Sequence, residues 1–225
     1  MQSYAGFITF LRDNTIIRPL KDHYRRGKRT VCLLRHDVTD DLDRAIELAT
    51  IENSLGVSGT YFVIPSDDLD IKKVKRIIEL GHEIGFHNNI LDKCFCNRRV
   101  GYAQRLFDEG VRYFQDNKIR IYGVSPCYSE SCSKYNVTNS DIFKEFRKRG
   151  KPDCIRHTNL FTISLKKSWL YETEYVLSDY RFNDYGGQWN GGKLEGVGVY
   201  PFIHNIATTT NSVIQVVIHP KEWDV

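Results

Sequence analysis

The stretch Val31–Asp41, which reads VCLLRHDVTDD, passes directly from four apolar residues into a cluster of ionisable ones. Four apolar residues in a row are typical of a strand that is covered on both faces, and such strands belong to parallel sheets flanked by helices. In those folds the chemistry gathers at the carboxyl ends of the strands. We therefore expect His36, Asp37 and Asp40 to emerge from a buried strand as part of a functional site.

The residues that follow alternate between helical and strand periods, which indicates an α/β fold. Apolar residues at helical spacing predict a helix over 42–55 that stops at Gly56. The β-rich run Thr60–Ile64 predicts a strand, and a second helix is expected over about 71–80, with Gly81 at its end.

The remaining elements are predicted by the same periodicities. About seven strands, separated mostly by helices, favour a closed or nearly closed parallel barrel over an open sheet. Residues 4–20 are expected to form a helix that runs into a loop, and residues 21–29 a basic lead-in to the first strand. Further along, we expect a strand over 83–86 ending at His87, a cysteine-bearing loop, a helix over about 100–114, a strand over 119–124 and a helix near 139–148. The last part of the chain is expected to form strands near 154–157 and 175–177, a glycine-rich loop over 184–198 that carries Trp189, a short helix over about 201–211, and a last strand over 213–218.

Length and composition indicate one globular domain. With 225 residues and 41% apolar content, the chain can bury a full-sized core without being subdivided. We expect a single domain over residues 1–225, in which residues 1–29 form an N-terminal helix and lead-in.

Composition also excludes several classes of protein. No segment approaches the roughly 20 consecutive apolar residues of a membrane span, and Met1–Phe10 lacks the pattern of an export signal. We therefore expect a cytoplasmic protein whose six cysteines are free thiols. The net charge of +4 is slight, and the basic clusters at 25–29 and 147–151 lack interleaved aromatic residues. They predict solvated surface rather than a nucleic-acid groove, and they are compatible with an anionic small substrate.

Ionisable side chains stand at four of the predicted strand ends: His36 with Asp37, then His87, Asp179 and His219. A parallel barrel brings the carboxyl ends of its strands to one face, so we expect these residues to converge. Carboxylates and imidazoles around one point are a ligand set for a divalent metal such as zinc, and a further histidine could transfer a proton near neutral pH.

Three runs of the sequence resemble the polysaccharide deacetylases of the NodB-like, carbohydrate esterase 4 family. They are RHDV at Arg35–Val38 followed by Asp40-Asp41, LGHEIGFH at Leu80–His87, and VIHPKEW at Val217–Trp223. The similarity is closest to the intracellular branch, which has an HDVD-type first motif and a closing H-P-x-x-W.

This resemblance implies a distorted (β/α) barrel of seven strands, a bound divalent metal, and hydrolysis of an N-acetyl group from a sugar. By position, Asp37 resembles the aspartate of the first motif and His87 the first metal histidine. His219 resembles the histidine that acts as general acid. The run at 125–129 is similar to the third motif, in which the backbone of Tyr128 would help to hold the oxyanion, and Asp179 is similar to the fourth motif.

The chain departs from the family pattern at two positions. The usual second metal histidine is replaced by Leu91, and the third-motif arginine by Ser125. The metal ligands expected from the resemblance are therefore Asp37 and His87, with help from Asp40, His36 or water.

Several residues also have structural interpretations. Thr39, Asp40 or Asp41 could cap the helix over 42–55 instead of binding a metal. His36 could be a ligand or a buried partner of Asp37. A zinc site built from Cys94, Cys96, Cys127 and Cys132 is disfavoured by their spacing, His82 is expected to be structural, and Trp189 and Trp223 could either stack on a sugar ring or pack in the protein.

The function expected from these residues is metal-dependent removal of an N-acetyl group from an amino sugar or glycan precursor, either free or linked to a nucleotide or lipid. Two other functions stay open. One is a degenerate deacetylase-like protein that binds carbohydrate without turning it over, which Leu91 and Ser125 support. The other is a metal-dependent phosphoesterase that uses the same acidic cluster.

Overall fold

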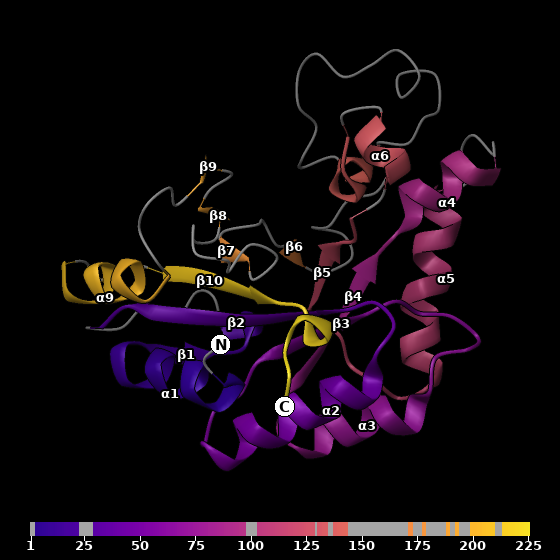
Figure 1. Ribbon diagram of the computed structural model, residues 1–225. Helices are drawn as coiled ribbons and strands as arrows, with labels where there is room; N and C mark the ends of the chain where they lie inside the picture. The colour runs from indigo at the N-terminus through magenta and orange to yellow at the C-terminus, as the bar shows by residue number, and fades with distance from the viewer. Residues whose placement is uncertain are drawn as a thin grey trace. The chain divides into compact units, whose positions relative to one another are not determined.

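The computed structural model describes residues 3–22, 29–97, 103–128, 130–134, 137–143, 171–172, 177–178, 188–189, 192–193, 199–209 and 213–225 (Figure 1). The chain forms two compact units, each assembled from separate stretches. The first unit comprises Met1–Phe62, Asp70–Ile84 and Glu174–Val225, and the second comprises Val63–Leu69 and Gly85–Thr173. The expected organisation as one domain stays a prediction.

The first unit is built around strand β2 (Val31–Val38), which is buried at all eight positions. β2 pairs in parallel with β1 (Ile16–Arg18) and with β10 (Val213–Ile218), and β10 pairs in parallel with β7 (Leu177–Ser178). β3 (Thr60–Val63) is also a hydrogen-bonded neighbour of β2. The apolar start of β2 therefore forms the doubly covered parallel strand that the sequence predicts.

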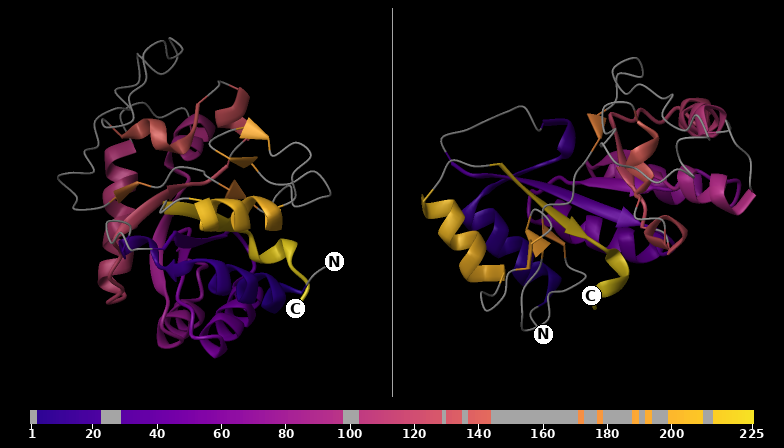
Figure 2. Two further views of the ribbon diagram at one scale, coloured as in Figure 1. Left: turned by 90° about the vertical axis from the view of Figure 1, so that its left-hand side faces the viewer. Right: turned by 90° about the horizontal axis from the view of Figure 1, so that it is seen from above.

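Four helices belong to the first unit: α1 (Tyr4–Asn14), α2 (Leu42–Ser54), α3 (Ile71–Glu79) and α9 (Val199–Thr209). α1, α2 and α3 lie on the same side of β2, and α9 packs against α1 (Figures 1 and 2). The short 3₁₀ segments η1 (Leu20–Asp22) and η5 (Pro220–Glu222) complete the unit.

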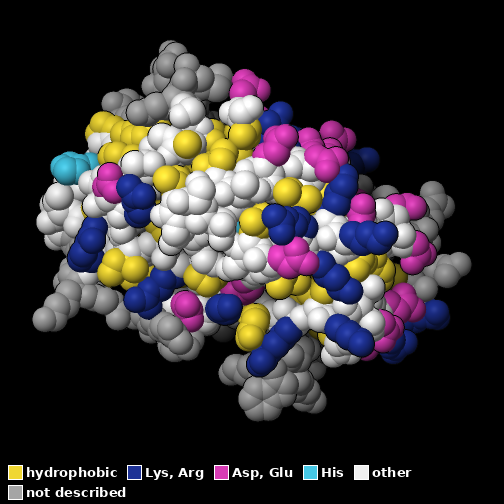
Figure 3. All heavy atoms as spheres, turned by 90° about the horizontal axis from the view of Figure 1, so that it is seen from below, with side chains coloured by type: hydrophobic (Ala, Val, Ile, Leu, Met, Phe, Trp, Pro, Cys, Tyr) yellow, Lys and Arg dark blue, Asp and Glu magenta, His cyan; other side chains and the backbone are white. Residues whose placement is uncertain are grey.

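The side of the molecule shown in Figure 3 carries acidic and basic side chains interspersed.

Local sequence explains where the helices of this unit begin and end. Ser3, Asp41 and Asp70 each accept a hydrogen bond from the backbone of the first helical turn, which satisfies an N–H group that has no intrahelical partner. Gly56 and Gly81 follow α2 and α3 with φ angles of +70° and +87°, a conformation that costs glycine little. Both predicted stops are confirmed, and of the three predicted cap candidates, Thr39, Asp40 and Asp41, it is Asp41 that caps α2.

The hydrophobic core of the first unit lies between the β2–β10 pair and helices α1, α2 and α9. α1 contributes four residues to this core, so it is an integral part of the first unit. The core residues are Tyr4, Phe7, Ile8, Leu11, Cys32, Leu34, Leu48, Val57, Val199, Ile203, Ile214, Val216 and Ile218. The helix predicted within residues 4–20 is confirmed as α1, but the stretch expected to be a loop contains β1, which joins the sheet.

The second unit contains β4 (Glu83–Asn88), whose first two residues belong to the first unit, and β5 (Gly123–Pro126) and β6 (Tyr171–Glu172), joined by parallel pairing. Its aromatic core contains Phe86, Phe107, Phe114 and Phe143. The remaining elements are α4 (Ile90–Asn97), α5 (Ala103–Asp116), α6 (Glu130–Lys134) and the 3₁₀ helix η2 (Asn139–Ile142).

These elements confirm the α/β class with parallel strands. Among the described residues, the hydrogen-bonded strands form an open run rather than a closed ring. Two predictions in the second unit were wrong: the cysteine-bearing segment is helix α4 instead of a loop, and the strand expected over 119–124 lies at 123–126. In the described part of the chain, no helix has the length and apolar character needed to cross a membrane.

Other predictions fall wholly or partly outside the described residues. The strand near 154–157 and Asp179 belong to this group. Of the helix near 139–148, the structure describes only the 3₁₀ turn η2, and of the loop over 184–198 it describes the antiparallel pair β8 (Gln188–Trp189) and β9 (Gly192–Lys193).

Gly81→Ala is expected to lower the free energy of unfolding by about 1–2 kcal/mol, the cost of a side chain in the left-handed conformation. A Cβ atom at this position meets nothing within 4 Å, so the backbone angle alone causes the effect. Urea denaturation of the wild type and the variant measures it. Equal stabilities would show that the turn after α3 can change its conformation at no cost.

Candidate active site

Asp37 and His219 lie side by side in the first unit, although they are far apart in the sequence. The register pairs Ile218 of β10 with His36 of β2, so the next residue of each strand reaches the same edge. His219 Nε2 lies 3.9 Å from Asp37 Oδ2, and both side chains are almost fully buried. The structure thus confirms that the ends of the first and last predicted strands meet.

Arg35 holds Asp37 through a buried two-pronged ion pair. Residues two apart in a strand point to the same face. Arg35 Nε and Nη2 donate to Asp37 Oδ1 and Oδ2, each over 2.6 Å, and the guanidinium also lies 5.5 Å from the centre of the Phe62 ring. Because a guanidinium is always charged, Arg35 balances the Asp37 carboxylate and fixes its plane.

Sequence reasoning assigned no role to Arg35. The spacing of Arg35 and Asp37 could have indicated this contact. Residues two positions apart in a strand share a face, and two opposite charges buried on one face are expected to pair. The chemical result is a carboxylate that can accept a proton, oriented from one side by Arg35 and faced by the imidazole of His219.

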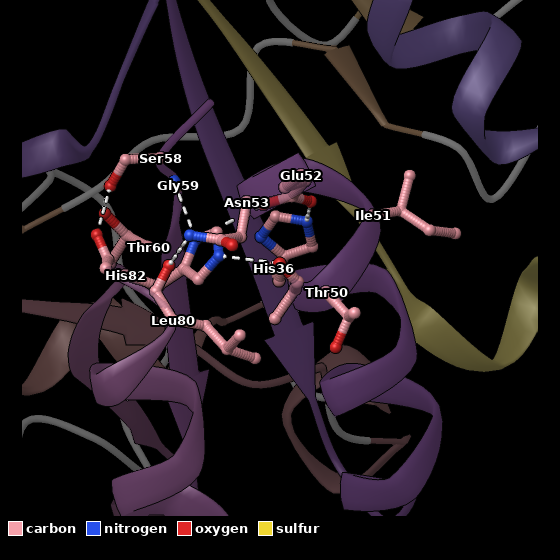
Figure 4. A network of polar contacts seen from close by, with 12 residues as sticks. His36, Thr50, Ile51, Glu52, Asn53, Ser58, Gly59, Thr60, Leu80 and His82 are labelled. Carbon is pink, nitrogen blue, oxygen red and sulfur yellow. Dashed lines mark hydrogen bonds and ion pairs between the residues drawn. The ribbon is translucent and has the colours of Figure 1, made fainter. Parts of the chain in front are cut away.

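His36 points away from this pair, because adjacent residues of a strand face opposite sides. Its Nε2 lies 2.7 Å from Glu52 Oε1 and 3.0 Å from the hydroxyl of Tyr4 (Figure 4 shows His36 and Glu52). The interpretation of His36 as a buried partner of Asp37 was therefore wrong, because its partners are Glu52 and Tyr4. These contacts do not support a role for His36 as a metal ligand beside Asp37 either.

The acidic residues after β2 lie at the start of α2. Asp41 Oδ1 accepts from the N–H of Arg44 over 2.8 Å, which makes Asp41 the helix cap. Asp40 is exposed and accepts from the hydroxyl of Thr39 over 2.9 Å. The capping interpretation holds for Asp41, and the predicted help of Asp40 in metal binding stays a prediction.

In the second unit, His87 near the end of β4 is buried against Ser125 of β5. His87 Nδ1 lies 2.8 Å from the Ser125 hydroxyl, and the register of β4 and β5 places the two residues opposite each other. Leu91 is fully buried, and its backbone N–H donates to Asn139 Oδ1 over 2.8 Å. Ser125 therefore orients the His87 ring, and Leu91 is a core residue of this unit.

Two buried asparagines fix the segment that follows β5. Asn139 donates from Nδ2 to the carbonyl of Cys127 over 2.8 Å, and Asn88 donates to the carbonyl of Asn139 over 2.8 Å. The N–H of Cys127 in turn donates to the carbonyl of Asn88 over 2.8 Å. Tyr128, the next residue in the chain, is 67% exposed and therefore lies at the surface beside this hydrogen-bonded segment.

Of the remaining predicted site residues, the structure places only Trp223. Asp179 and the side chain of Trp189 lie outside the described residues. Trp223 packs on Phe7, with ring centres 5.3 Å apart and nearly parallel planes, which favours the packing interpretation of this tryptophan over sugar stacking.

The described cysteines agree with free thiols. Cys32 and Cys94 form no disulfide, and burial raises their pKa values to about 12 and about 11, so neither is a reactive thiolate near neutral pH.

The described residues do not form a metal site by themselves. Among them, no group of three or more histidine, cysteine, aspartate or glutamate side chains has the arrangement that could hold a metal ion. Within the first unit, Asp37 already receives two hydrogen bonds from Arg35, and His36 contacts Glu52. Metal ligation by Asp37 and His87 therefore stays a prediction from the sequence motifs.

No protein-family model matches the sequence, and a search of curated proteins finds no match. Three bacterial proteins of solved structure are similar to this chain. They are a polysaccharide deacetylase from Bacillus cereus (16% identity, 85% of this chain and 80% of the other covered, TM-score 0.48), a CE4 esterase from Streptococcus mutans (14%, 86% and 75%, TM-score 0.47), and the peptidoglycan deacetylase PdaC from Bacillus subtilis (12%, 85% and 88%, TM-score 0.43).

Arg35→Met should lower the free energy of unfolding by about 3–5 kcal/mol, because the Asp37 carboxylate would be left buried without its counter-charge. Arg44→Met is the matched control, since it removes an ion pair at the surface, where such pairs contribute about 0–1 kcal/mol. Denaturant titrations of both variants at neutral pH measure the difference. If the two variants were equally stable, the Arg35–Asp37 pair would not be a buried constraint.

His82 makes the stability of the first unit depend on pH. Burial lowers the pKa of His82 below its usual 6.5, and the opposing charge of Glu52 and the hydrogen bond with the carbonyl of Ala49 do not reverse this (Figure 4). The folded state therefore favours neutral His82. As the pH falls below 6.5, the unfolded chain binds the proton more readily than the folded chain, so the free energy of unfolding decreases.

The slope assigned to His82 should reach at most about 1.4 kcal/mol per pH unit below pH 6.5. His82→Gln keeps a side chain that can donate and accept a hydrogen bond but removes the titration. Denaturant unfolding between pH 5 and 7 should show a flatter pH dependence for this variant than for the wild type. Identical slopes would show that His82 does not titrate differently in the two states.

Proposed function

We propose that this protein is a hydrolase that removes the N-acetyl group from an amino sugar, in the manner of the NodB-like deacetylases. The observation that supports this proposal best is the pair formed by Asp37 and His219. The two residues come from the first and last of the sequence motifs, and they lie 3.9 Å apart at adjacent strand ends.

The pair supplies the two proton transfers that hydrolysis of an acetamide requires. Asp37 takes a proton from water while the water oxygen attacks the carbonyl carbon. His219 gives a proton to the sugar nitrogen as the carbon–nitrogen bond breaks, which yields acetate and a free amine. Arg35 donates to both oxygens of Asp37, which fixes the orientation of the carboxylate beside His219.

A divalent metal in this family would polarise the acetyl oxygen and activate the water. The described donors do not form such a site within one unit, so the two proton transfers above are derived for the side chains alone. Ligation by Asp37 with His87, with zinc as the metal, rests on the sequence motifs. Elemental analysis of protein purified without chelator, beside His87→Ala, tests it through metal content.

The proposed substrate is an N-acetylated amino sugar or glycan precursor, with a nucleotide or lipid carrier as an option. A net charge of +4 favours a phosphorylated carrier over a strongly basic substrate. A cytoplasmic location, as the sequence predicts, would suit a role in the synthesis of a polysaccharide precursor.

A second candidate function is carbohydrate binding without turnover. Two observations favour it: Leu91 is a buried core residue at the position of the family's second metal histidine, and Ser125 contacts His87 at the position of the family's arginine. Leu91 has no group that can ligate a metal, and Ser125 carries no charge where the family has an arginine.

Release of acetate separates the two functions. A panel of N-acetylhexosamines and their nucleotide conjugates is incubated with the protein and with added zinc, cobalt or nickel, and acetate is measured. We expect release from at least one member of the panel. If calorimetry shows binding of a sugar and no acetate is released under any of the metals, the binding function replaces the hydrolase.

His219→Ala should lower kcat by about a hundredfold or more, which is the usual contribution of a general acid, while the fold persists. His204→Ala is a matched control, because His204 is an exposed histidine of α9 whose imidazole contacts the side chain of Asn14. Acetate release and circular dichroism are measured on both. Full activity in His219→Ala, or loss of its folded spectrum, would assign His219 a structural role.

A further inference from the structure

Behind the Asp37–His219 pair, on the opposite face of β2, lies a buried cluster of ionisable side chains. It contains Tyr4 of α1, His36 of β2, Glu52 of α2, Tyr61 of β3 and His82, which follows α3. All five belong to the first unit. Ionisable groups in a protein interior reduce stability unless they are paired and hydrogen-bonded.

Three contacts define the position of the His36 ring. Its Nε2 lies 2.7 Å from Glu52 Oε1 and 3.0 Å from the hydroxyl of Tyr4, and that hydroxyl donates to the same carboxylate oxygen. The ring also stacks on Tyr61, with centres 3.9 Å apart and planes 2° from parallel. His36 is therefore held by α1, α2 and β3 together.

Glu52 contacts both histidines of the cluster: its Oε1 lies 2.7 Å from His36 Nε2, and its Oε2 lies 3.4 Å from His82 Nδ1. His82 Nδ1 accepts from the N–H of Gly59 over 3.1 Å, so its proton lies on Nε2 and faces the carbonyl of Ala49 (Figure 4). Burial by itself would raise the pKa of Glu52, but the charge and hydrogen bond of His36, with smaller contributions from His82 and Tyr4, lower it below the usual 4.5. Glu52 is a carboxylate at neutral pH.

The cluster is not an optimised stabilising network. His36 Nδ1, Glu52 Oε2 and the Tyr61 hydroxyl are buried and make no hydrogen bond among the described residues, although Glu52 Oε2 lies 3.4 Å from His82 Nδ1. A partly satisfied buried network is less favourable than an apolar core of the same shape. Stability alone therefore does not explain a glutamate at position 52, and its geometry indicates another role.

The cluster is connected to the segment that carries Asp37 and to the segment that follows His219. His36 stands between Arg35 and Asp37 in β2, so a fixed His36 ring fixes the peptide units that direct the other two side chains to the opposite face. Tyr4 also contacts Trp223 edge to face, with ring centres 5.1 Å apart. Trp223 follows the 3₁₀ turn η5 that begins after His219.

We propose that Glu52 is a positioning residue: by holding His36 directly, and the His219 turn through Tyr4 and Trp223, it sets the relative placement of Asp37 and His219. The kinetic part of this inference rests on the proposed hydrolase function. The structural part does not, because the placement of His219 can be observed in protein that has no substrate.

Two variants remove the charge or the hydroxyl bridge without changing the shape of the core. Glu52→Gln keeps the volume and a hydrogen-bonding group but removes the charge, and Tyr4→Phe keeps the ring against Trp223 while removing the hydroxyl. Leu48→Ala is the matched control, since Leu48 is a buried residue of the same helix in the same hydrophobic core and takes no part in the recorded contacts of the cluster. Thermal unfolding of all three variants establishes the temperature at which each is folded.

The first measurement is independent of activity. Nuclear magnetic resonance of protein labelled with ¹³C and ¹⁵N in histidine records the imidazole signals of His219. We expect these signals to shift in Glu52→Gln and in Tyr4→Phe and to stay at their wild-type positions in Leu48→Ala. Unchanged signals in both folded variants, or an equal shift in Leu48→Ala, would overturn the proposal; if Glu52→Gln does not fold, Tyr4→Phe decides.

The second measurement is kinetic and uses the sugar that the acetate assay identifies. Misplacement of a reacting group by about 1 Å can cost about a hundredfold in rate, so Glu52→Gln should lose about tenfold to a hundredfold in kcat with KM within about twofold. Leu48→Ala, assayed below its unfolding temperature, should keep wild-type kcat. A kcat loss in Leu48→Ala as large as in Glu52→Gln would overturn the positioning role. If the wild type releases no acetate, the hydrolase proposal fails and the His219 signals alone decide this one.

Discussion

The buried strand β2 imposes the main physical constraint on this structure. All eight of its residues are buried, yet three adjacent ones, Arg35, His36 and Asp37, are ionisable. Because isolated charges cannot remain in a protein interior, each needs a partner that the fold brings from elsewhere or from the strand itself. The arrangement of α1, α2 and β10 around β2 answers this requirement on both faces of the strand.

The two faces of β2 differ in what they can do. On one face, Arg35 pairs with Asp37, and the imidazole of His219 lies beside the same carboxylate. On the other face, His36 is enclosed by Glu52, Tyr4 and the Tyr61 ring. The first arrangement is suited to proton transfer, and the second is suited to holding the strand in place.

Each unit satisfies its buried polar groups by itself. In the second unit, Leu91 packs in the core and Ser125 contacts His87. In the first unit, Arg35 pairs with Asp37 from within the same strand. The Asp37 carboxylate is thus held by a local contact that needs only the alternation of a strand.

The sequence by itself determined the elements whose signals are local. The run of apolar residues at 31–34 specified a doubly buried strand, Gly56 and Gly81 specified the ends of two helices, and the apolar run at 213–218 specified the last strand. Each of these depends on periodicity or on one backbone angle, so no distant residue was needed. The motifs around Asp37 and His219 likewise identified two residues that the structure brings together.

Only the tertiary structure decided the partners. That His36 contacts Glu52, that Tyr4 reaches both of them, and that β1 joins the sheet depend on which helix covers which face, and no short pattern in the sequence carries that information. The cysteine-bearing segment showed the same limit, because Asn139, more than 40 positions away, accepts hydrogen bonds from the first backbone N–H groups of α4. The partners of His36 and the hydrogen bonds of Asn139 are set by packing, which is why they could be observed but not predicted.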